Sequence, residues 1–467
     1  MANARLACAA LAAALISASC AQGPTPMPGA RPAARPAFGS PPSGSSPIQH
    51  VVLLIQENRS FDNLFATFPG ADGATTGRKG IKTVRLRMAR LGEPCDFGHS
   101  YKGFIRDYNH GKMNGFEREG GSAHCPGKAG KGPYQYVNPR HIVPYWDIAA
   151  EYVLGDHMFQ TQGSGSFTAH QDLIRGGTTI DAAQTISMVD YPSHIPWGCD
   201  APEGTKTSLL VLQTGGQLKN EYHQGPYPCT TKFGSAPYLT LRDLLDTGHV
   251  SWKYYSPPVD NGSGNYWNAF DMIAAVRYGP EWKTNVTNNE KLIFNDVLHG
   301  GLPAVSWLIP DAANSDHPGT GSDTGPSWVA AVVNAIGSSQ YWKNTAIIVV
   351  WDDWGGFYDH EPPPLRDQWG GLGFRVPMLL ISPYARETSA SKPGYISHTQ
   401  YEFGSIIKFI EENWGLGALG TTDQRANSIS DCFDYSQQPR AFVPIGAPYS
   451  LKYFLHQRPS YKPVDTE

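Results

Sequence analysis

Two adjacent carboxylates, Asp352 and Asp353, follow directly after the apolar run 346–351. An apolar run of this length is typical of a buried strand in a parallel sheet. Ligands of open α/β sheets bind just beyond the carboxyl ends of the strands. Carboxylates buried at such an end need compensation, and a hard divalent cation supplies it. Solvated loop acids are the usual alternative for an isolated Asp-Asp pair.

A second stretch far upstream has the same design and favours the cation. Residues 51–55 again predict a buried strand, and Glu57 and Asn58 follow it at once. Two neighbouring strands that each end on two oxygen-bearing side chains can surround one cation. The chain therefore predicts a divalent metal site, and its oxygen ligands favour magnesium, calcium or manganese.

A loop of glycine and serine at 162–166 leads into a predicted helix that extends to about residue 174. Such a junction presents free backbone N–H groups and the positive end of the helix dipole, which suits an anion such as phosphate. A serine here would have a polarised oxygen. The alternative interpretation is that Ser164 or Ser166 only caps the helix.

Strands and helices alternate along the chain, which predicts one α/β domain with a mostly parallel sheet. Further strands are predicted over 249–255, 303–310 and 376–382, and helices over 60–65, 102–109, 144–152, 239–245, 327–336 and 401–414. Residues 191–237 hold many prolines and few periodic runs, so we predict an irregular insertion there.

The chain has 467 residues, a net charge of −4 and 40% hydrophobic residues, enough for a large core and without the basic excess of a nucleic-acid-binding protein. Residues 1–21 predict a secretory signal, because the apolar run after Arg5 is too short to span a membrane. Lipidation of Cys20 is the alternative processing. Residues 22–46 predict a flexible tether and 47–467 the folded domain, in a protein that is exported and periplasmic or secreted.

Five cysteines remain after the predicted signal. In an oxidising compartment disulfides are expected, and the local pairings are Cys95 with Cys125 and Cys199 with Cys229. Cys432 is then left over. The chain has no CxxC motif, which disfavours a zinc–thiolate site.

Six motifs carry a resemblance to a known family: QENRSFDNLF, GKMNGF, GSFTAHQ, SDHPG, WDDWGGFYDH and RVPMLLISPYAR. The resemblance covers roughly residues 49–416. The chain resembles the phosphoesterase family of bacterial phospholipases C and acid phosphatases, in the alkaline phosphatase superfamily. The resemblance implies a three-layer sandwich around a mostly parallel sheet, with irregular insertions.

The resemblance also implies residue roles. Glu57, Asn58, Asp352 and Asp353 match the metal ligands of the family, and Ser166 matches its nucleophile. The family has an asparagine three residues after the nucleophile.

This chain has Ala169 at the position of that asparagine, which leaves Ser164 and Thr168 as alternative nucleophiles.

Histidines complete the implied site. His99 and His317 match family histidines that contact the phosphate, and one of them would protonate the leaving oxygen. His170 and His360 lie inside motifs and are expected to line the site, with His170 on the substrate side.

The predicted function is an exported, metal-dependent phosphomonoesterase of the acid phosphatase type, which hydrolyses phosphate esters through a phosphoserine. GSFTAHQ is closer to the phosphatase pattern, and the chain ends soon after the catalytic core. The alternatives are a phospholipase C that cleaves phosphatidylcholine-type lipids, and a non-catalytic surface binding protein, motivated by Ala169. The expected partner is a phosphate ester or a phospholipid headgroup, with membrane attachment if Cys20 is lipidated.

Overall fold

The structure is a computed structural model that describes residues 46–121, 127, 129–234, 236–364, 371–389 and 391–461. The predicted signal, Cys20 and the tether up to residue 45 lie outside these residues, so these assignments stay predictions, as do the domain bounds. Within the described residues, no helix combines the length and the apolar character needed to cross a membrane.

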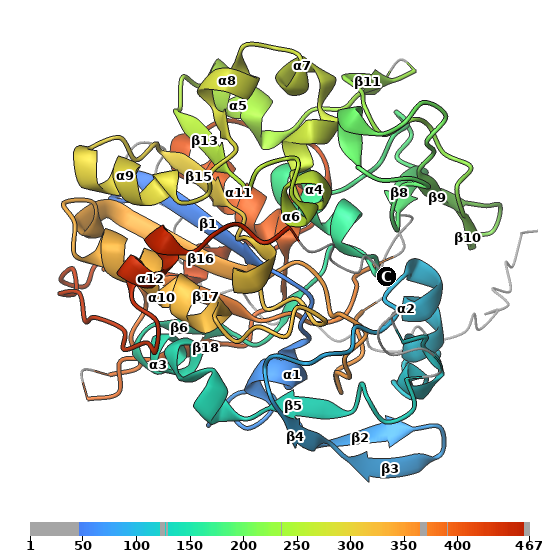
Figure 1. Cartoon of the computed structure of the whole chain (residues 1–467), viewed down its shortest axis with the longest axis horizontal. Helices are drawn as coiled ribbons and strands as arrows, with labels where there is room; N and C mark the ends of the chain where they lie inside the picture. Colours follow the sequence, from blue (N-terminus) through green and yellow to red (C-terminus); the bar gives the residue numbers. More distant parts are fainter. Residues whose placement is uncertain are drawn as a thin grey trace, which may run out of the picture. The chain divides into compact units, whose positions relative to one another are not determined.

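Among the described residues, eight strands form a central sheet in the order β14-β13-β15-β1-β16-β17-β6-β18 (Figure 1). Neighbouring strands are parallel except around β17, which runs antiparallel to both β16 and β6. The strands are β1 (His50–Gln56), β6 (Val153–Gly155), β13 (Trp252–Tyr255), β14 (Val286–Thr287), β15 (Val305–Leu308), β16 (Thr345–Trp351), β17 (Met378–Ile381) and β18 (Tyr395–Ser397). The predicted α/β class and mostly parallel sheet are confirmed.

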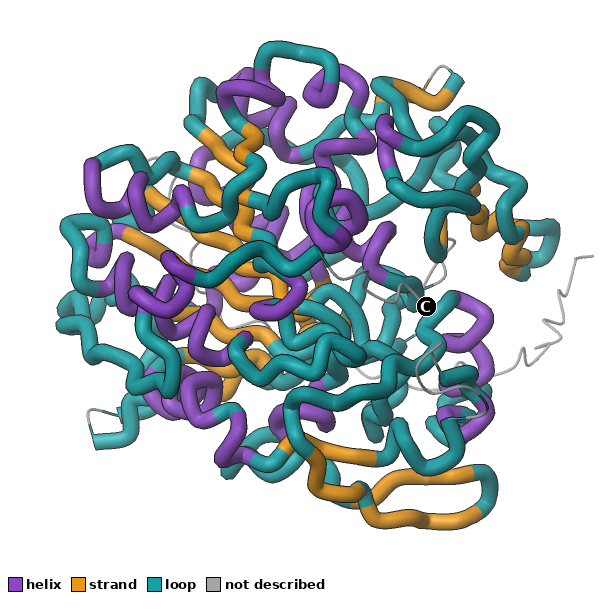
Figure 2. The backbone as a smooth tube through the Cα atoms, in the orientation of Figure 1, coloured by secondary structure: helices purple, strands orange, loops and turns teal. Residues whose placement is uncertain are grey.

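Helices flank this sheet in two groups. Helix α4 packs against α11, whereas α10 packs against α3, α9 and α12. The helices are α1 (Phe61–Phe65), α2 (Tyr101–Tyr108), α3 (Val143–Glu151), α4 (Ser166–Arg175), α5 (Leu241–Thr247), α6 (Gly262–Tyr266), α7 (Ala274–Arg277), α8 (Glu281–Thr284), α9 (Leu292–His299), α10 (Gly325–Gly337), α11 (Phe403–Trp414) and α12 (Leu451–His456). Long loops connect them, as Figure 2 shows and as 50 glycines and 38 prolines lead one to expect.

Strands β1 and β16 are direct neighbours, and this pairing positions the predicted ligands. Their parallel register pairs Gln56 with Trp351, the last residue of each strand. Every residue of β16 is buried, as are all but the first of β1, because both consist mainly of valine, isoleucine and leucine that pack on the two faces of the sheet. The next residues, Glu57 and Asp352, therefore leave the sheet at the same level.

The prediction of an irregular insertion at 191–237 is wrong in part. Strands β9 (Ser208–Leu212) and β10 (Leu218–Glu221) pair antiparallel, and β8 (Ile186–Val189) joins them in a three-stranded sheet. The apolar run at 208–212 and the glycine turn at 215–216 mark this hairpin in the sequence.

Smaller strands complete the described structure: β2 (Thr76–Lys79), β3 (Lys82–Arg85), β4 (Arg87–Ala89), β5 (Gln135–Val137), β7 (Met158–Phe159), β11 (Lys232–Phe233), β12 (Ala236–Pro237) and β19 (Tyr401–Glu402).

The cysteines follow the local pairing. Cys199 and Cys229 form a disulfide, and Cys432 is free and buried, as predicted. Cys125 lies outside the described residues, so its predicted pairing with Cys95 stays a prediction.

We expect the double variant Cys199→Ser, Cys229→Ser to lose about 2–4 kcal/mol of unfolding free energy, because the disulfide closes a long loop in the unfolded chain. Urea denaturation of both proteins without reductant measures this difference. An unchanged midpoint and slope would show that the insertion does not need the crosslink.

Candidate active site

Hydrogen bonds from backbone N–H groups to the side chain of Asp352 hold together the loops that follow β1 and β16. Asp352 Oδ1 accepts from the backbone N–H of Asn58 (2.9 Å) and from that of Asp353 (2.7 Å). Asn58 has a φ of 54°, in the left-handed region. A Cβ on Gly355 would lie 2.5 Å from the carbonyl oxygen of Asn58, so only glycine allows this approach.

Helix α4 brings two further side chains to the same place. Ser166 is its first residue, and Ser166 Oγ donates to Asp353 Oδ2 (3.1 Å). His170 lies four residues later and so on the same face of the helix. Its Nε2 is 2.8 Å from Glu57 Oε1 and 3.9 Å from Asp352 Oδ2. The first turn of α4 thus connects the ends of both strands.

The two alternative nucleophiles are engaged elsewhere. Ser164 Oγ and Thr168 Oγ1 are hydrogen bonded to each other at 2.5 Å. Ser164 Oγ also accepts from the backbone N–H of Asp190, and Thr168 Oγ1 donates to the carbonyl of Gly165. Of the three hydroxyls, Ser166 is therefore the one that we place at the carboxylates.

The oxygen atoms of this group are suited to a cation. Within the described residues, Glu57 Oε2, Asn58 Oδ1 and Asp352 Oδ2 are buried and have no hydrogen-bond partner. Unpaired buried acceptors are costly, and a hard cation would satisfy all of them. His170 adds a nitrogen beside Glu57 and Asp352, with ligand atoms within 4.8 Å of one another. The donor set fits the divalent metal that the sequence predicts.

Burial makes the charges of this group expensive. Glu57, Asp352 and Asp353 are fully buried. Burial and the charge of Asp352 raise the pKa of Glu57 well above its usual range. Burial and the charge of Asp353 raise the pKa of Asp352 to about 6, and burial raises the pKa of Asp353 to about 7. Without a cation the folded chain resists ionising all three acids.

His170 behaves as a neutral base. Burial lowers its pKa to about 4, although the charge of Asp352 acts in the opposite direction. Neutral imidazole is the form that binds metals. The structure therefore places His170 among the carboxylates, whereas the sequence placed it on the substrate side. Its four-residue spacing from Ser166 on a predicted helix was the signal for this position.

His99 approaches the same carboxylates from another loop. Its Nδ1 donates to the carbonyl of Phe97 (2.7 Å), and its Nε2 lies 3.2 Å from Asn58 Nδ2 and 3.8 Å from Asp353 Oδ2. In the neutral ring Nε2 accepts from the Asn58 amide. This bond leaves Asn58 Oδ1 available to a cation.

His317 is linked to the group through an aromatic side chain that sequence reasoning missed. The Trp267 ring stacks on His170, with centroids 6.4 Å apart, and on His317, with centroids 5.7 Å apart. His317 Nδ1 donates to the carbonyl of Pro318. Both histidines and Trp267 are buried, so the three rings form a rigid stack.

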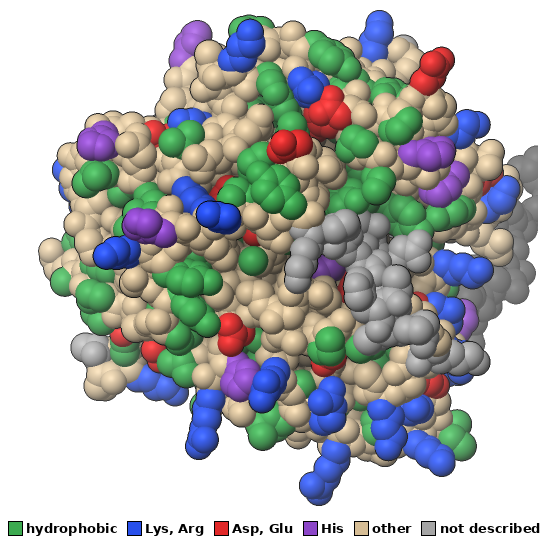
Figure 3. Space-filling view, viewed as in Figure 1, with side chains coloured by type: hydrophobic (Ala, Val, Ile, Leu, Met, Phe, Trp, Pro, Cys, Tyr) green, Lys and Arg blue, Asp and Glu red, His purple; other side chains and the backbone are tan. Residues whose placement is uncertain are grey.

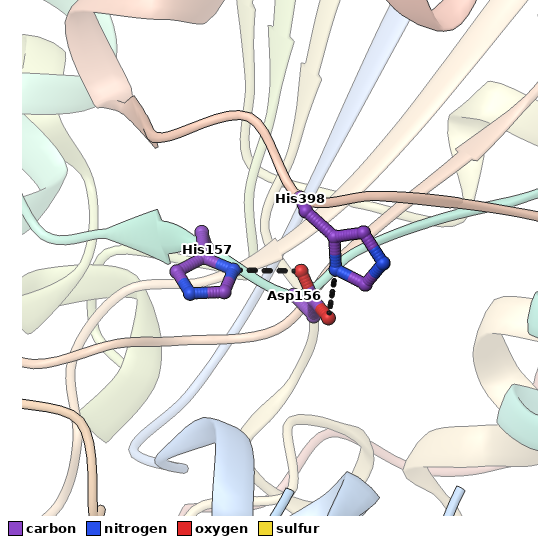
Figure 4. Close-up of side chains that lie close together, drawn as sticks. All are labelled: Asp156, His157 and His398. Carbon is purple, nitrogen blue, oxygen red and sulfur yellow. Dashed lines mark hydrogen bonds and ion pairs between the residues drawn. The ribbon is translucent and has the colours of Figure 1, made fainter. Parts of the chain in front are cut away.

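A second group of histidines and carboxylates surrounds Asp156, outside the predicted site. The two oxygens of this buried carboxylate accept from His157 Nδ1 and His398 Nδ1, each at 2.8 Å (Figure 4). His157 Nε2 lies 3.3 Å from Asp72. These bonds tie three loops together.

His360 belongs to this second group. It was expected to line the site, yet its Nδ1 donates to Asp62 (2.8 Å) and its Nε2 lies 3.3 Å from Asp72. The buried guanidinium of Arg375 donates to Asp359 (2.9 Å) and lies over the ring of Phe61. The interactions of His360 fix the loop after Asp353 to the start of α1.

Comparison with known proteins gives this chain its family. Residues 48–417 match the Phosphoesterase family. The chain belongs to the phosphoesterase family. It is accordingly a phosphoric ester hydrolase, as the resemblance implied.

Curated relatives of the chain are named as phospholipases C. The non-hemolytic phospholipase C of Pseudomonas aeruginosa is 27% identical over 79% of this chain, which spans 54% of that protein. Phospholipase C A of Mycobacterium tuberculosis is 24% identical, and the match covers 90% of this chain and 84% of that protein. Non-specific phospholipase C1 of Arabidopsis thaliana is 26% identical over 86% of this chain and 74% of its own.

Solved structures are less similar. A protein in the alkaline phosphatase superfamily from Vibrio parahaemolyticus is 10% identical, with a TM-score of 0.37. The match covers 84% of this chain and 75% of that protein.

We expect divalent cations to stabilise the wild-type protein and to lose this effect in Asp352→Asn. A cation at a hundred times its Kd adds about 2.7 kcal/mol to the unfolding free energy. The asparagine keeps Oδ1 for both N–H groups but removes a buried charge, so without metal the variant should be no less stable than wild type. Thermal melting with magnesium, calcium, manganese or zinc in turn measures both effects.

Asp260→Asn, at an exposed aspartate, is the matched control and should keep the cation response of the wild type. Equal stabilisation of Asp352→Asn and wild type by the same ion would contradict this site.

We also expect a pH-dependent contribution of His360 to stability. Burial opposes its protonation, but the hydrogen bond and charge of Asp62 outweigh burial and raise the pKa of His360 to about 9, from 6.5. The stabilisation is complete below pH 6.5 and is lost as the pH rises through 9. His360→Gln should therefore cost about 2–3 kcal/mol at pH 6 and much less at pH 9.5.

Urea denaturation across this pH range, beside His299→Gln at the exposed end of α9, measures the difference. A cost for His360→Gln that is independent of pH would contradict the raised pKa.

Proposed function

We propose that the chain is a metal-dependent phospholipase C, which cleaves the phosphodiester of phosphatidylcholine-type lipids on the diacylglycerol side. The observation that carries this proposal is similarity to proteins named phospholipase C over 79–90% of the chain. These comparisons favour phospholipase C over the phosphomonoesterase that the sequence led us to expect. The short motif behind that expectation, GSFTAHQ, forms the first turns of α4 and so positions the nucleophile rather than the leaving group.

Ser166 is the proposed nucleophile. Its Oγ attacks phosphorus, the bond between phosphorus and the diacylglycerol oxygen breaks, and that oxygen takes up a proton. Water then attacks the phosphoserine, the Oγ–phosphorus bond breaks, Ser166 regains its proton and the phosphorylated headgroup leaves. The hydrogen bond from Ser166 to Asp353 Oδ2 supports this role, because it orients the hydroxyl toward the carboxylate that would receive its proton.

Glu57, Asn58, Asp352 and Asp353 are the proposed ligands of a divalent cation, and we add His170 beside them. A cation held there supplies positive charge to the phosphate and to the serine oxygen. The candidate ions are magnesium, calcium, manganese and zinc, and the nitrogen of His170 favours manganese and zinc among them.

The neighbouring histidines have separate proposed roles. His99 holds the Asn58 amide so that Oδ1 faces the cation, and this positioning role takes the place of the phosphate contact that the resemblance implied, because both ring nitrogens of His99 are engaged. His317 is the proposed acid for the leaving oxygen, since Trp267 holds its ring at one edge of the site. We favour an enzyme over a non-catalytic binding protein, because the unpaired oxygens of the ligand group are suited to a cation beside Ser166.

The test compares hydrolysis of phosphatidylcholine and of p-nitrophenyl phosphate by the purified protein with each cation. We expect the phospholipid to be the better substrate. Ser166→Ala should reduce turnover by at least about a thousandfold with the metal-dependent melting temperature unchanged. Preference for the phosphomonoester would restore the acid phosphatase assignment.

Ser164→Ala and Thr168→Ala are the matched controls, because each removes a hydroxyl from the same segment. Their turnover should fall far less than that of Ser166→Ala. If Ser166→Ala stays active and one control does not, that hydroxyl is the nucleophile.

A further inference from the structure

A basic hairpin projects from the described part of the chain next to the active-site loop. Strands β2 and β3 pair antiparallel and are joined by Gly80 and Ile81. Gly80 has a φ of 54°, which a tight turn of this kind requires. Ile81 is 96% exposed, the highest value among the exposed large hydrophobic side chains of the described residues. An isoleucine at a hairpin tip in water stabilises nothing within the fold.

Positive charge surrounds this apolar tip. Residues 76–90 contain no Asp or Glu, although the whole chain has a net charge of −4. The basic residues of the segment are Arg78, Lys79, Lys82, Arg85, Arg87 and Arg90. All of them are exposed except Lys79, which is partly buried. Lys and Arg side chains gather at the bottom of the view in Figure 3, where Figure 1 places β2 and β3.

Two lysines flank the turn of the hairpin. Lys79 and Lys82 are direct partners across the two strands, on either side of the turn. Like charges in this position destabilise a hairpin unless an anion lies between them. Glu117 Oε1 lies 3.8 Å from the Cβ position of Gly80, and Lys79 Nζ donates to the carbonyl of Gly130 (3.2 Å). Within the described residues, no acid forms an ion pair with the exposed basic side chains Arg78, Lys82 and Arg85. The tip itself therefore favours an external anion.

The base of the hairpin packs on the active-site loop. The backbone N–H of Arg78 donates to the hydroxyl of Tyr358 (3.1 Å), and a Cβ on Gly77 would lie 2.7 Å from that ring. Tyr358 belongs to one buried cluster with Leu86 and with Trp354, the residue that follows Asp353. The hairpin is thus firmly attached to the loop that carries the proposed metal ligands.

We propose that this hairpin docks the protein on the surface of an anionic phospholipid membrane. Ile81 enters the boundary between headgroups and acyl chains, and the lysines and arginines around it contact lipid phosphates. The inference rests on the proposed function in one respect: docking would hold the active-site loop close to a lipid substrate. Binding itself requires no turnover.

Vesicle sedimentation tests the proposal with the full chain. The probes are vesicles of phosphatidylcholine alone and of phosphatidylcholine mixed with phosphatidylglycerol. We expect the wild type to prefer the anionic vesicles and to dissociate at high salt. The anionic vesicles should bind the triple variant Arg78→Glu, Lys82→Glu, Arg85→Glu on the order of a hundredfold more weakly than the wild type. They should bind Ile81→Asp about tenfold more weakly.

Matched controls carry the same changes at exposed positions elsewhere: Lys206→Glu, Lys283→Glu, Lys452→Glu combined, and Leu298→Asp, whose side chain is 76% exposed. Both controls should bind vesicles like the wild type. All variants should melt like the wild type and hydrolyse p-nitrophenyl phosphorylcholine, a soluble substrate, at its rate.

Three results would overturn the proposal: equal vesicle binding by the hairpin variants and wild type, an equal loss in the matched controls, or full binding by Ile81→Asp together with equally tight binding to soluble polyphosphate. The last result would define a general polyanion site without membrane insertion. Vesicle binding without hydrolysis of any substrate would instead leave the docking surface intact and overturn the proposed phospholipase activity.

Discussion

The mutual repulsion of three buried carboxylates is the constraint on which the site depends. Glu57, Asp352 and Asp353 lie at the ends of two adjacent strands, where water cannot screen them. The fold tolerates this arrangement because backbone N–H groups bind Asp352 and Asp353 on one side. Of the remaining oxygens, Glu57 Oε2 and Asp352 Oδ2 have no hydrogen-bond partner, which is stable only with shared protons or with a cation.

The rest of the site can be understood as a response to that constraint. Helix α4 begins at the carboxylates, so its positive end offsets part of their charge. Its first turn presents Ser166 to one strand end and His170 to the other. Trp267 then fixes His170 and His317 in a single stack. A proposed nucleophile, a neutral imidazole and a proposed acid are thereby placed around one negative centre by short, rigid connections.

The sequence was sufficient to predict that Glu57, Asn58, Asp352 and Asp353 lie together, because their positions follow from simple rules. An apolar run that ends in carboxylates specifies both burial and location, and neighbouring parallel strands bring such ends together. The register of β1 and β16 confirms that step for Glu57 and Asp352. The four-residue spacing of Ser166 and His170 also predicts that both lie on one face of the helix. The role of His170 could not be predicted in this way, because it depends on which carboxylate lies beside it in the folded chain.

Other features depended on contacts that no local pattern records. The stacking of Trp267 and the network around Asp156 join segments that are far apart in the chain. The hairpin of β9 and β10 was missed because prolines and cysteines nearby concealed a short apolar run. His360 was expected at the site because it lies in the same motif as Asp353, yet the chain turns between them and carries His360 to Asp62.

One aromatic cluster connects the buried chemistry to the surface of the protein. Trp354 follows the ligand Asp353, and Tyr358 lies four residues further on, against the base of the basic hairpin. Ser60, just after Asn58, donates to the carbonyl of Tyr358, so both ligand loops are attached to this cluster. The hairpin is therefore connected to the proposed ligands through close-packed side chains. The same packing joins the loop after Asp353 to the hairpin that we propose binds a membrane.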